Sequence, residues 1–170
     1  MRKLNDLTQL ELLQEVSYNS ESGMFISLKN SKCRKIGDLL GTLTKRGYVV
    51  IRVLGNQYKA HRLAWLYMTG SFPKGMLDHK DTIKSNNQWS NLREATTYEN
   101  AWNVGVHPKS STGFKGVCKR KCGYEVSIQA NGKRKYLGVF KTAEEAGKAY
   151  TEAAKQLHKN FFNNGRKELD

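Results

Sequence analysis

Four polar residues in the middle of the chain have the types and spacing of a hydrolytic site. The segment reads LDHKDTIKSNNQWSNLREATTYENAWN, where Asp78 and His79 are adjacent, Asn91 follows after eleven residues and Asn100 after eight more. Hydrolysis of a phosphodiester needs a base that activates water and a cation that stabilises charge on the phosphate and the leaving oxygen. One His beside one Asp supplies the base and a ligand for the cation. A turn Asp followed by a surface His is the alternative interpretation.

The order and spacing of these residues resemble the HNH superfamily, in the variant whose final His is replaced by Asn. The motifs that carry the resemblance are AHRLAW, GSFPKGMLDH, NQWSNLREAT and the dipeptide EN, and the match covers roughly residues 20–104. They are similar to phage free-standing and intron-encoded homing endonucleases. The resemblance implies a ββα-metal fold and metal-dependent cleavage of DNA.

The implied fold assigns a role to each residue. Adjacent residues on a strand point to opposite faces, so Asp78 and His79 share one site only where another element converges on the strand. In the ββα-metal fold, the helix after the second strand supplies that convergence. Thr96 and Glu99 predict a capping box that places Asn100 in the first turn of this helix.

These positions predict one divalent-cation site. Asp78 and Asn100 are the expected ligands, because hard oxygen donors with positions left for water and phosphate suit Mg²⁺ or Mn²⁺. His79, with an ordinary pKa of about 6.5, is the expected general base. Asn91 is the second catalytic-site residue, a brace whose amide ties the two strands together, and orientation of His79 is another role open to it.

Several neighbours leave alternatives open. Asn103 lies one helical turn from Asn100 and is the alternative ligand. His61 is interpreted as a helix-start His that packs or bonds locally, with a phosphate or substrate contact as the alternative. We expect Trp65 and Trp89 to be core residues rather than base-stacking platforms. Asp81 is expected to be solvated in its polar loop.

The composition favours a polyanionic partner. The 170 residues include 29 Lys and Arg against 15 Asp and Glu, a formal net charge of +14. No stretch approaches the roughly 18 apolar residues that span a bilayer, and the N-terminus has no secretory signal, so a soluble, cytoplasmic protein is expected, in the bacterial host if phage-encoded. The odd number of cysteines argues against a disulfide framework, and Cys118 and Cys122 have no second pair to complete a zinc site.

The N-terminal half predicts short mixed elements. Leu7, Leu10, Leu13 and Val16 are spaced three apart, which indicates an amphipathic helix over residues 5–17. Two hairpins are expected next, one turning at residues 20–23 and one at Gly55-Asn56. A short helix over residues 61–69 should follow, with Leu63, Leu66 and Tyr67 on one side.

The C-terminal part predicts a second module. Residues 104–113 have linker composition, so we place a nuclease domain at 1–106 and a DNA-binding domain at 107–170. FKGVCKR, YEVSIQA and KRKYLGVF read as three strands, with Asn131-Gly132 as the last turn. Thr142 and Glu145 predict a capping box for an Ala-rich helix that covers one face of the sheet. The predicted fold class is therefore α+β, with β-hairpins and a ββα-metal nuclease domain before a three-stranded antiparallel sheet packed on one helix.

This module resembles the plant ethylene-response-factor type of DNA-binding domain over residues 113–164. The motifs KGV, YLGVF and TAEEA carry the resemblance, which implies a sheet docked in the major groove of DNA. Cys118, Lys121 and Cys122 depart from the family pattern, so base specificity cannot be carried over. The alternation along YEVSIQA points Tyr124, Val126 and Ile128 to the helix and the residues between them outward. The expected DNA-contacting residues are Lys115, Lys119, Arg120, Gln129, Arg134, Lys135 and Tyr136.

Together these features predict a monomeric, metal-dependent endonuclease acting on double-stranded DNA, without a small-molecule cofactor or a membrane. A catalytically inactive DNA-binding regulator is the alternative. An RNA-binding module is disfavoured, because the paired aromatic residues of the usual RNA-recognition sheet are missing.

Overall fold

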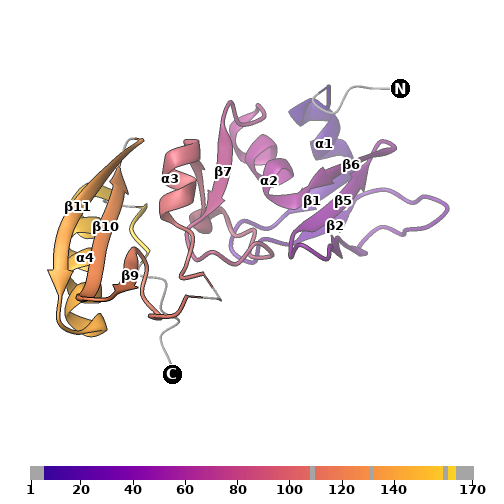
Figure 1. Cartoon of the computed structure of the whole chain (residues 1–170). Coiled ribbons are helices and arrows are strands. Elements are labelled where there is room, and N and C mark those ends of the chain that lie inside the picture. The colour runs from indigo at the N-terminus through magenta and orange to yellow at the C-terminus, as the bar shows by residue number, and fades with distance from the viewer. Residues whose placement is uncertain (1–5, 108–109, 131, 159–160, 164–170) are drawn as a thin grey trace. The chain divides into compact units, whose positions relative to one another are not determined.

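The computed structural model describes residues 6–107, 110–130, 132–158 and 161–163, and these residues form a mixed α and β fold. The chain divides into two compact units, residues 1–94 and residues 95–170. The first unit combines two α-helices with short strands, and the second has a longer sheet and a long helix (Figure 1). The expected boundary at residues 106 and 107 lies inside the second unit.

The first unit begins with helix α1 (Gln9–Glu15), whose first turn is closed by a capping box between Thr8 and Glu11. Leu7 and Leu12 are buried on either side of the cap, in the positions of a hydrophobic staple. The prediction that Leu7, Leu10, Leu13 and Val16 form one buried face is therefore wrong in part, since Leu10 is 67% and Leu13 37% exposed. A spacing of three drifts around a helix with 3.6 residues per turn, and the capped start turns Leu12 to the core instead.

Two small sheets follow. Strands β1 (Val16–Tyr18), β2 (Phe25–Ser27) and β3 (Leu39–Leu40) form one in that order, and the predicted turn at residues 20–23 joins its first two strands. Strands β4 (Thr42–Leu43), β5 (Val49–Val53) and β6 (Asn56–Lys59) form the other. Val53 pairs with Asn56, so the tight turn is Leu54-Gly55, one residue before the predicted pair. Both turn residues have positive φ, 46° and 84°, and glycine adopts such a conformation without strain.

Helix α2 (Ala60–Thr69) closes the core of this unit. It ends at Gly70, which has a φ of 83° and accepts the left-handed conformation that terminates many helices. Leu63 and Leu66 are buried and Tyr67 packs beside them, as predicted. The core is completed by residues from α1 and both sheets, including Leu12, Val16, Phe25, Ile51, Val53 and Tyr58.

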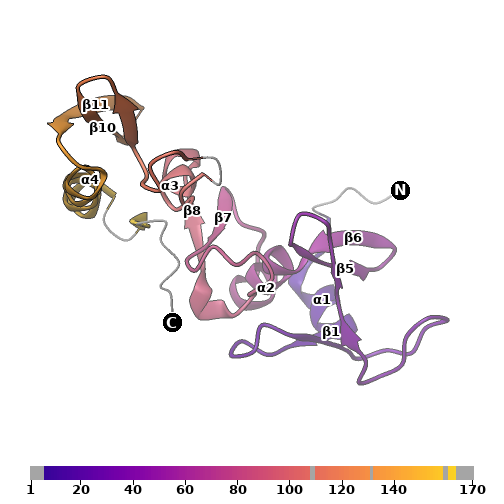
Figure 2. The same ribbon diagram turned by 60° about the horizontal axis from the view of Figure 1, so that its bottom comes forward.

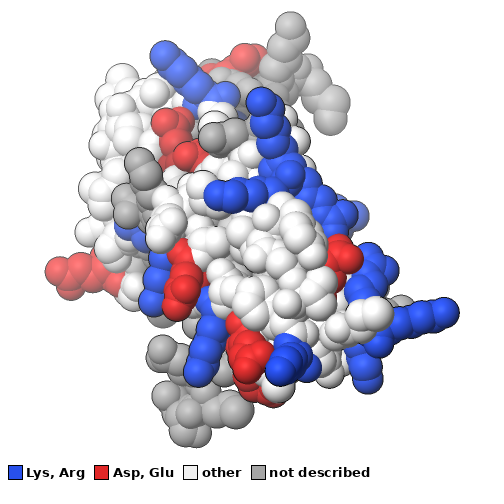
Figure 3. Space-filling view, turned by 60° about the vertical axis from the view of Figure 1, so that its left-hand side comes forward, with Lys and Arg blue, Asp and Glu red and all other residues white. Residues whose placement is uncertain are grey.

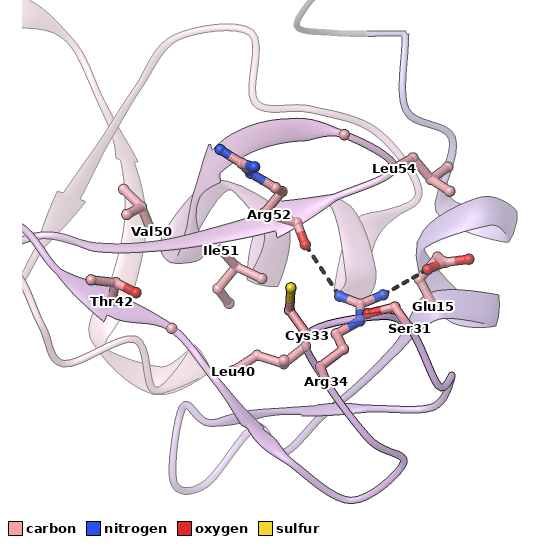
Figure 4. A pocket seen from close by; sticks show the side chains of 12 residues that line it. Glu15, Ser31, Cys33, Arg34, Leu40, Thr42, Val50, Ile51, Arg52 and Leu54 are labelled. Carbon is pink, nitrogen blue, oxygen red and sulfur yellow. Dashed lines mark hydrogen bonds and ion pairs between the residues drawn. The ribbon is translucent and has the colours of Figure 1, made fainter.

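A cavity of about 560 Å³ lies between the hairpins of the first unit, and Figure 4 shows the side chains that line it. Arg34 spans its wall, because Nη2 lies 2.8 Å from the Glu15 carboxylate and Nη1 donates to the Arg52 carbonyl at 3.2 Å. Lys29 also pairs with Glu15. This buried acid therefore joins the segment after β2 to α1, and the cavity contains none of the predicted catalytic residues.

The segment that holds the predicted motif forms strand β7 (Met76–His79), a loop, the 3₁₀ turn η1 (Trp89–Asn91) and strand β8 (Leu92–Ala95). Strands β7 and β8 make a two-stranded sheet. Helix α3 (Thr97–Trp102) comes next along the chain, and the predicted capping box between Thr96 and Glu99 is present.

The second unit includes α3, which explains why its boundary precedes the predicted one. Trp102 stacks on His158 with ring centroids 4.5 Å apart, and His158 Nε2 lies 3.0 Å from the Gln129 carbonyl oxygen. Asn163 donates to the Asn103 carbonyl at 2.9 Å. These contacts join α3 to the C-terminal elements, although the linker-like composition of residues 104–113 predicted a boundary after α3.

The C-terminal sheet has the predicted strands. They are β9 (Val117–Arg120), β10 (Gly123–Ala130) and β11 (Lys133–Phe140), antiparallel with β10 in the centre. Helix α4 (Ala143–His158) begins at the capping box of Thr142 and Glu145 and covers one face, as Figure 2 shows. Val126 and Ile128 are buried against Ala146, Tyr150 and Ala154. Asn131, in the predicted turn, lies outside the described residues.

Within the part of the chain that the structure describes, no helix is long and apolar enough to cross a membrane.

Candidate functional site

Asp78 and His79 end strand β7, and both are buried, with 6% and 4% exposure. Their side chains meet different partners, as expected for neighbours on a strand. Asp78 Oδ2 accepts two hydrogen bonds from Arg93 on β8, from Nε at 2.9 Å and from Nη2 at 2.7 Å. Sequence reasoning missed this pair, which a known register between the two strands would have indicated.

His79 packs against a second histidine. The rings of His79 and His61 meet edge to face, with centroids 5.0 Å apart and an interplanar angle of 88°. Tyr48 lies beside both, 5.5 Å from His61 and 6.3 Å from His79 between centroids. The three rings form a cluster drawn from the segment before β5, the start of α2 and the end of β7.

Burial lowers the pKa of His79 below its ordinary value, and the positive charge of Lys84 acts in the same direction. A hydrogen bond with Asn87 and the charges of Asp81 and Asp78 oppose this shift without reversing it. His79 is therefore neutral near pH 7, the protonation state in which an imidazole can accept a proton.

His61 is buried in the first turn of α2, with 5% exposure. Burial is the main cause that lowers its pKa to about 3, and His79, Lys59 and Arg62 add to it. Its Nδ1 has no hydrogen-bond partner among the described residues. The predicted local packing is present, but its partner is His79, which no sequence periodicity connects to residue 61.

The loop between β7 and β8 is held by Asn91. Its Nδ2 donates to Asp81 Oδ1 at 3.0 Å and to the Asn86 carbonyl at 2.9 Å, while its Oδ1 accepts from the backbone of Asp81. Asp81 is exposed to solvent, as expected, but its side chain also accepts hydrogen bonds within the loop. Its carboxylate also accepts from Ile83 N and Asn86 Nδ2, so it organises the loop beside His79.

The same loop is anchored to the β1–β2 hairpin. Tyr18 donates its hydroxyl to the Asn87 carbonyl at 2.7 Å, and Trp89 N donates to the Ser20 carbonyl at 2.9 Å. At Gly23, with a φ of 72°, a Cβ would lie 2.5 Å from the Asn87 backbone. Asn87, a neighbour of His79 that sequence reasoning missed, is therefore fixed by contacts with the N-terminal hairpin.

Two tryptophans predicted as core residues pack on one another. The ring centroids of Trp65 and Trp89 are 5.1 Å apart, and both side chains are partly buried. Neither belongs to the fully buried core, because both side chains keep part of their surface accessible to solvent.

Asn100 and Asn103 lie in the second unit, so the structure describes them apart from Asp78. Asn100 is partly exposed in α3. Asn103 is buried, and its Oδ1 accepts from Asn163 at 3.3 Å. Of these two candidate metal ligands, Asn100 has the more exposed side-chain oxygen. That Asp78 and Asn100 bind the same cation stays a prediction.

The donor set suits a hard divalent cation. One carboxylate and one amide oxygen are ligands that Mg²⁺ and Mn²⁺ accept, with water or phosphate in the remaining positions. Within the described ranges, no group of three or more His, Cys, Asp and Glu could hold a metal by itself. Cys33, Cys118 and Cys122 are exposed free thiols.

The open face of the C-terminal sheet carries a defined row of side chains. Directly opposed residues of antiparallel strands share a face, and Ser127 opposes Tyr136 while Gln129 opposes Arg134. Glu125 opposes both Val139 and Cys118. Tyr136 and Val139 are 61% and 49% exposed. Figure 3 shows Lys and Arg side chains in several groups around a largely uncharged central area, interspersed with smaller groups of Asp and Glu.

Three of the predicted DNA contacts do not share this face. Lys119 opposes Tyr124 and Lys135 opposes Ile128, which places both lysines on the helix side of the sheet. Lys115 is partly buried, and its Nζ donates to the carbonyls of Trp102 and Val104 at 2.6 and 2.7 Å. Burial lowers its pKa to about 8. Lys115 therefore links the start of the C-terminal sheet to the end of α3 and the segment after it. Its position among other basic residues in the sequence did not indicate this structural role.

The chain is similar to a known family, to two viral proteins and to one solved structure. Residues 58–102 match the family described as HNH endonuclease. The "Uncharacterized HNH endonuclease L560" of Acanthamoeba polyphaga mimivirus is 34% identical over 122 residues, or 70% of this chain and 63% of that protein. "Protein 3.8" of Escherichia phage T7 is 34% identical over 83 residues, or 45% of this chain and 69% of that protein. The chain thus spans less than two thirds of the mimivirus relative.

One solved structure, "DNA binding and cleavage by the HNH homing endonuclease I-HmuI", is similar at 22% identity and a TM-score of 0.42, over 92% of this chain and 93% of that chain. The matched family segment contains His61, Asp78, His79, Asn91 and Asn100, the residues described above. Over residues 58–102, the chain is therefore similar to the HNH endonuclease family.

Proposed function

We propose that the chain is a divalent-metal-dependent endonuclease of the homing type, which hydrolyses phosphodiester bonds of double-stranded DNA. The observation that carries the proposal is His79, a buried imidazole with a lowered pKa beside the carboxylate of Asp78. A base that is neutral at pH 7 and an oxygen ligand on adjacent residues meet the two needs of phosphodiester hydrolysis.

In the proposed reaction, a ring nitrogen of His79 accepts a proton from the water that attacks the phosphorus. The ring is oriented by His61, Tyr48 and Asn87, and Asn91 holds the loop that carries Asn87. Asp78 and Asn100 would hold one Mg²⁺ or Mn²⁺. That cation would stabilise charge on the phosphate and on the leaving 3′ oxygen.

The C-terminal sheet is the proposed DNA-docking module, over residues 107–170. Support comes from the net charge of +14 and from a face that presents Arg120, Gln129, Arg134 and Tyr136 together. A sheet fits the major groove, where Arg and amide side chains bond base edges. Lys119 and Lys135 are proposed as phosphate contacts from the helix side of the sheet.

The test is cleavage of supercoiled DNA by the full chain with Mg²⁺ or Mn²⁺, with and without chelator, on DNA that includes the chain's native genomic neighbourhood. We expect relaxed or linear product that requires metal and is lost in His79→Ala. His107→Ala, which replaces an exposed histidine of the second unit, is the matched control and should cut normally. Normal cleavage by His79→Ala would overturn the assignment of the base. DNA binding by wild type without cleavage would favour the DNA-binding regulator.

A further inference from the structure

An acid occupies the middle of the face proposed to dock on DNA. Glu125 Oε2 accepts from Arg120 Nε at 3.1 Å, and Oε1 lies 3.5 Å from Arg134 Nη2. The Glu125 side chain is 25% exposed, against 58% and 65% for the two arginines. One carboxylate therefore bridges two guanidinium groups that come from the strands on either side of it.

Arg134 has a second anchor on the same face. Its Nε donates to Ser127 Oγ at 2.9 Å. Ser127 lies on β10, two residues before Gln129, which is the register partner of Arg134. A guanidinium held through Nε and one Nη keeps its plane fixed, while its remaining N–H groups are available for a ligand. The arrangement orients an otherwise flexible side chain before any ligand binds.

Stability does not account for this acid. Ion pairs between exposed side chains contribute little to folding, because solvent screens them and two long side chains lose freedom. On a DNA-docking face, a carboxylate also repels phosphates and weakens binding that does not depend on sequence. A residue that costs general affinity and orients two arginines is suited to discrimination between sequences.

We propose that Glu125 is a specificity-determining positioning residue, which holds Arg120 and Arg134 toward base edges rather than phosphates. Guanine is the base class that this geometry fits, because a fixed guanidinium bonds its O6 and N7 together in the major groove. The inference rests on the proposed docking of this face on DNA. It adds to the proposed DNA docking a residue, Glu125, that makes binding depend on the base sequence.

The test is selection of bound duplexes from a randomised library by the full chain in chelator, followed by titration of the selected and a scrambled duplex. Glu125→Gln keeps the size of the side chain and removes its charge. We expect its affinity for scrambled DNA to rise several-fold, and its preference for the selected duplex to fall by about tenfold or more, with guanine enrichment lost. Ser127→Ala should lower the preference to a smaller degree, through Arg134 alone.

Glu152→Gln is the matched control, because Glu152 is an exposed acid on α4, which covers the other face of the sheet. It should raise general affinity slightly and leave the preference unchanged. If Glu125→Gln and Ser127→Ala both keep the preference within twofold of wild type, Glu125 does not position the arginines and the inference is overturned. If Arg120→Ala and Arg134→Ala bind both the selected and the scrambled duplex with wild-type affinity, the face does not dock, and both this inference and the docking part of the proposed function fail.

Discussion

Arg93 places two of its hydrogen-bond donors on a single oxygen of Asp78, Nε at 2.9 Å and Nη2 at 2.7 Å from Oδ2. The side chains of both residues are largely buried, with 14% and 7% exposure. A buried carboxylate is costly without a compensating charge. Arg93 therefore fixes the residue that is the predicted metal ligand of the first unit.

Replacement of Arg93 by Leu should lower the free energy of unfolding by about 3–5 kcal/mol, because Asp78 is left buried without its cationic partner. Urea denaturation monitored by circular dichroism measures the change. Asp78→Asn combined with Arg93→Leu should recover part of the loss, since no charge then remains buried. A single variant as stable as wild type would mean that the pair does not determine the local structure.

The buried histidines predict a loss of stability in acid. The folded pKa of His61 is lowered to about 3 and that of His79 is lowered as well, mainly by burial. Below the ordinary value of about 6.5, the unfolded chain binds protons that the folded chain does not, so stability falls as pH decreases toward 3. Above pH 7 neither group contributes a slope.

His61→Phe keeps an aromatic ring against His79 and removes one titrating group. Its free energy of unfolding should decrease less steeply between pH 6 and pH 4 than that of wild type, by up to about 1.4 kcal/mol per pH unit. Urea titrations at several pH values give both slopes. Identical slopes for the two proteins would show that His61 is not held neutral in the folded state.

Local sequence patterns predicted elements better than contacts between them. The capping boxes at Thr96 and Thr142 and the alternation along β10 are read from neighbouring residues, and the structure contains them. The buried face predicted for α1 is wrong at Leu10 and Leu13, because a leucine every three residues leaves two faces possible until the packing partner is known.

The surroundings of the candidate site could be predicted only in part. Asp78, His79 and Asn91 are close in sequence, and their spacing identified them. The packing of His61 on His79 and the bond from Tyr18 to Asn87 join segments that only tertiary structure brings together. The hydrogen bonds of Lys115 and Asp81 were not predicted for the same reason, since each residue bonds groups that a charge pattern cannot reveal.

Asn91 should matter for cleavage more than for folding. Asn91→Ala removes the bonds to Asp81 and Asn86, so the loop beside His79 loses its brace, at a cost of about 1–3 kcal/mol. Asn91→Asp should be worse, because it places a second carboxylate against that of Asp81. The measurement is single-turnover cleavage alongside urea denaturation. Equal cleavage by Asn91→Ala and wild type would contradict the brace.

Lys115→Met and Lys119→Ala distinguish a structural lysine from a lysine that is proposed to contact phosphates. Lys115→Met leaves the carbonyls of Trp102 and Val104 without their charged donor, so it should destabilise the second unit by about 1–3 kcal/mol. It should leave the salt dependence of DNA binding unchanged, whereas loss of one phosphate contact reduces the slope of log K against log salt by about one.

Lys119→Ala is the matched comparison, because it removes an exposed cation that is proposed as a phosphate contact. Filter binding of the full chain to one duplex between 50 and 200 mM salt, roughly the range over which phosphate contacts are resolved, gives the slope for each variant. A slope that falls by about one in Lys115→Met would return Lys115 to the DNA interface. In the folded chain the ammonium donates two of its three N–H groups to carbonyls, so a phosphate contact would have to use the third N–H or displace that tether.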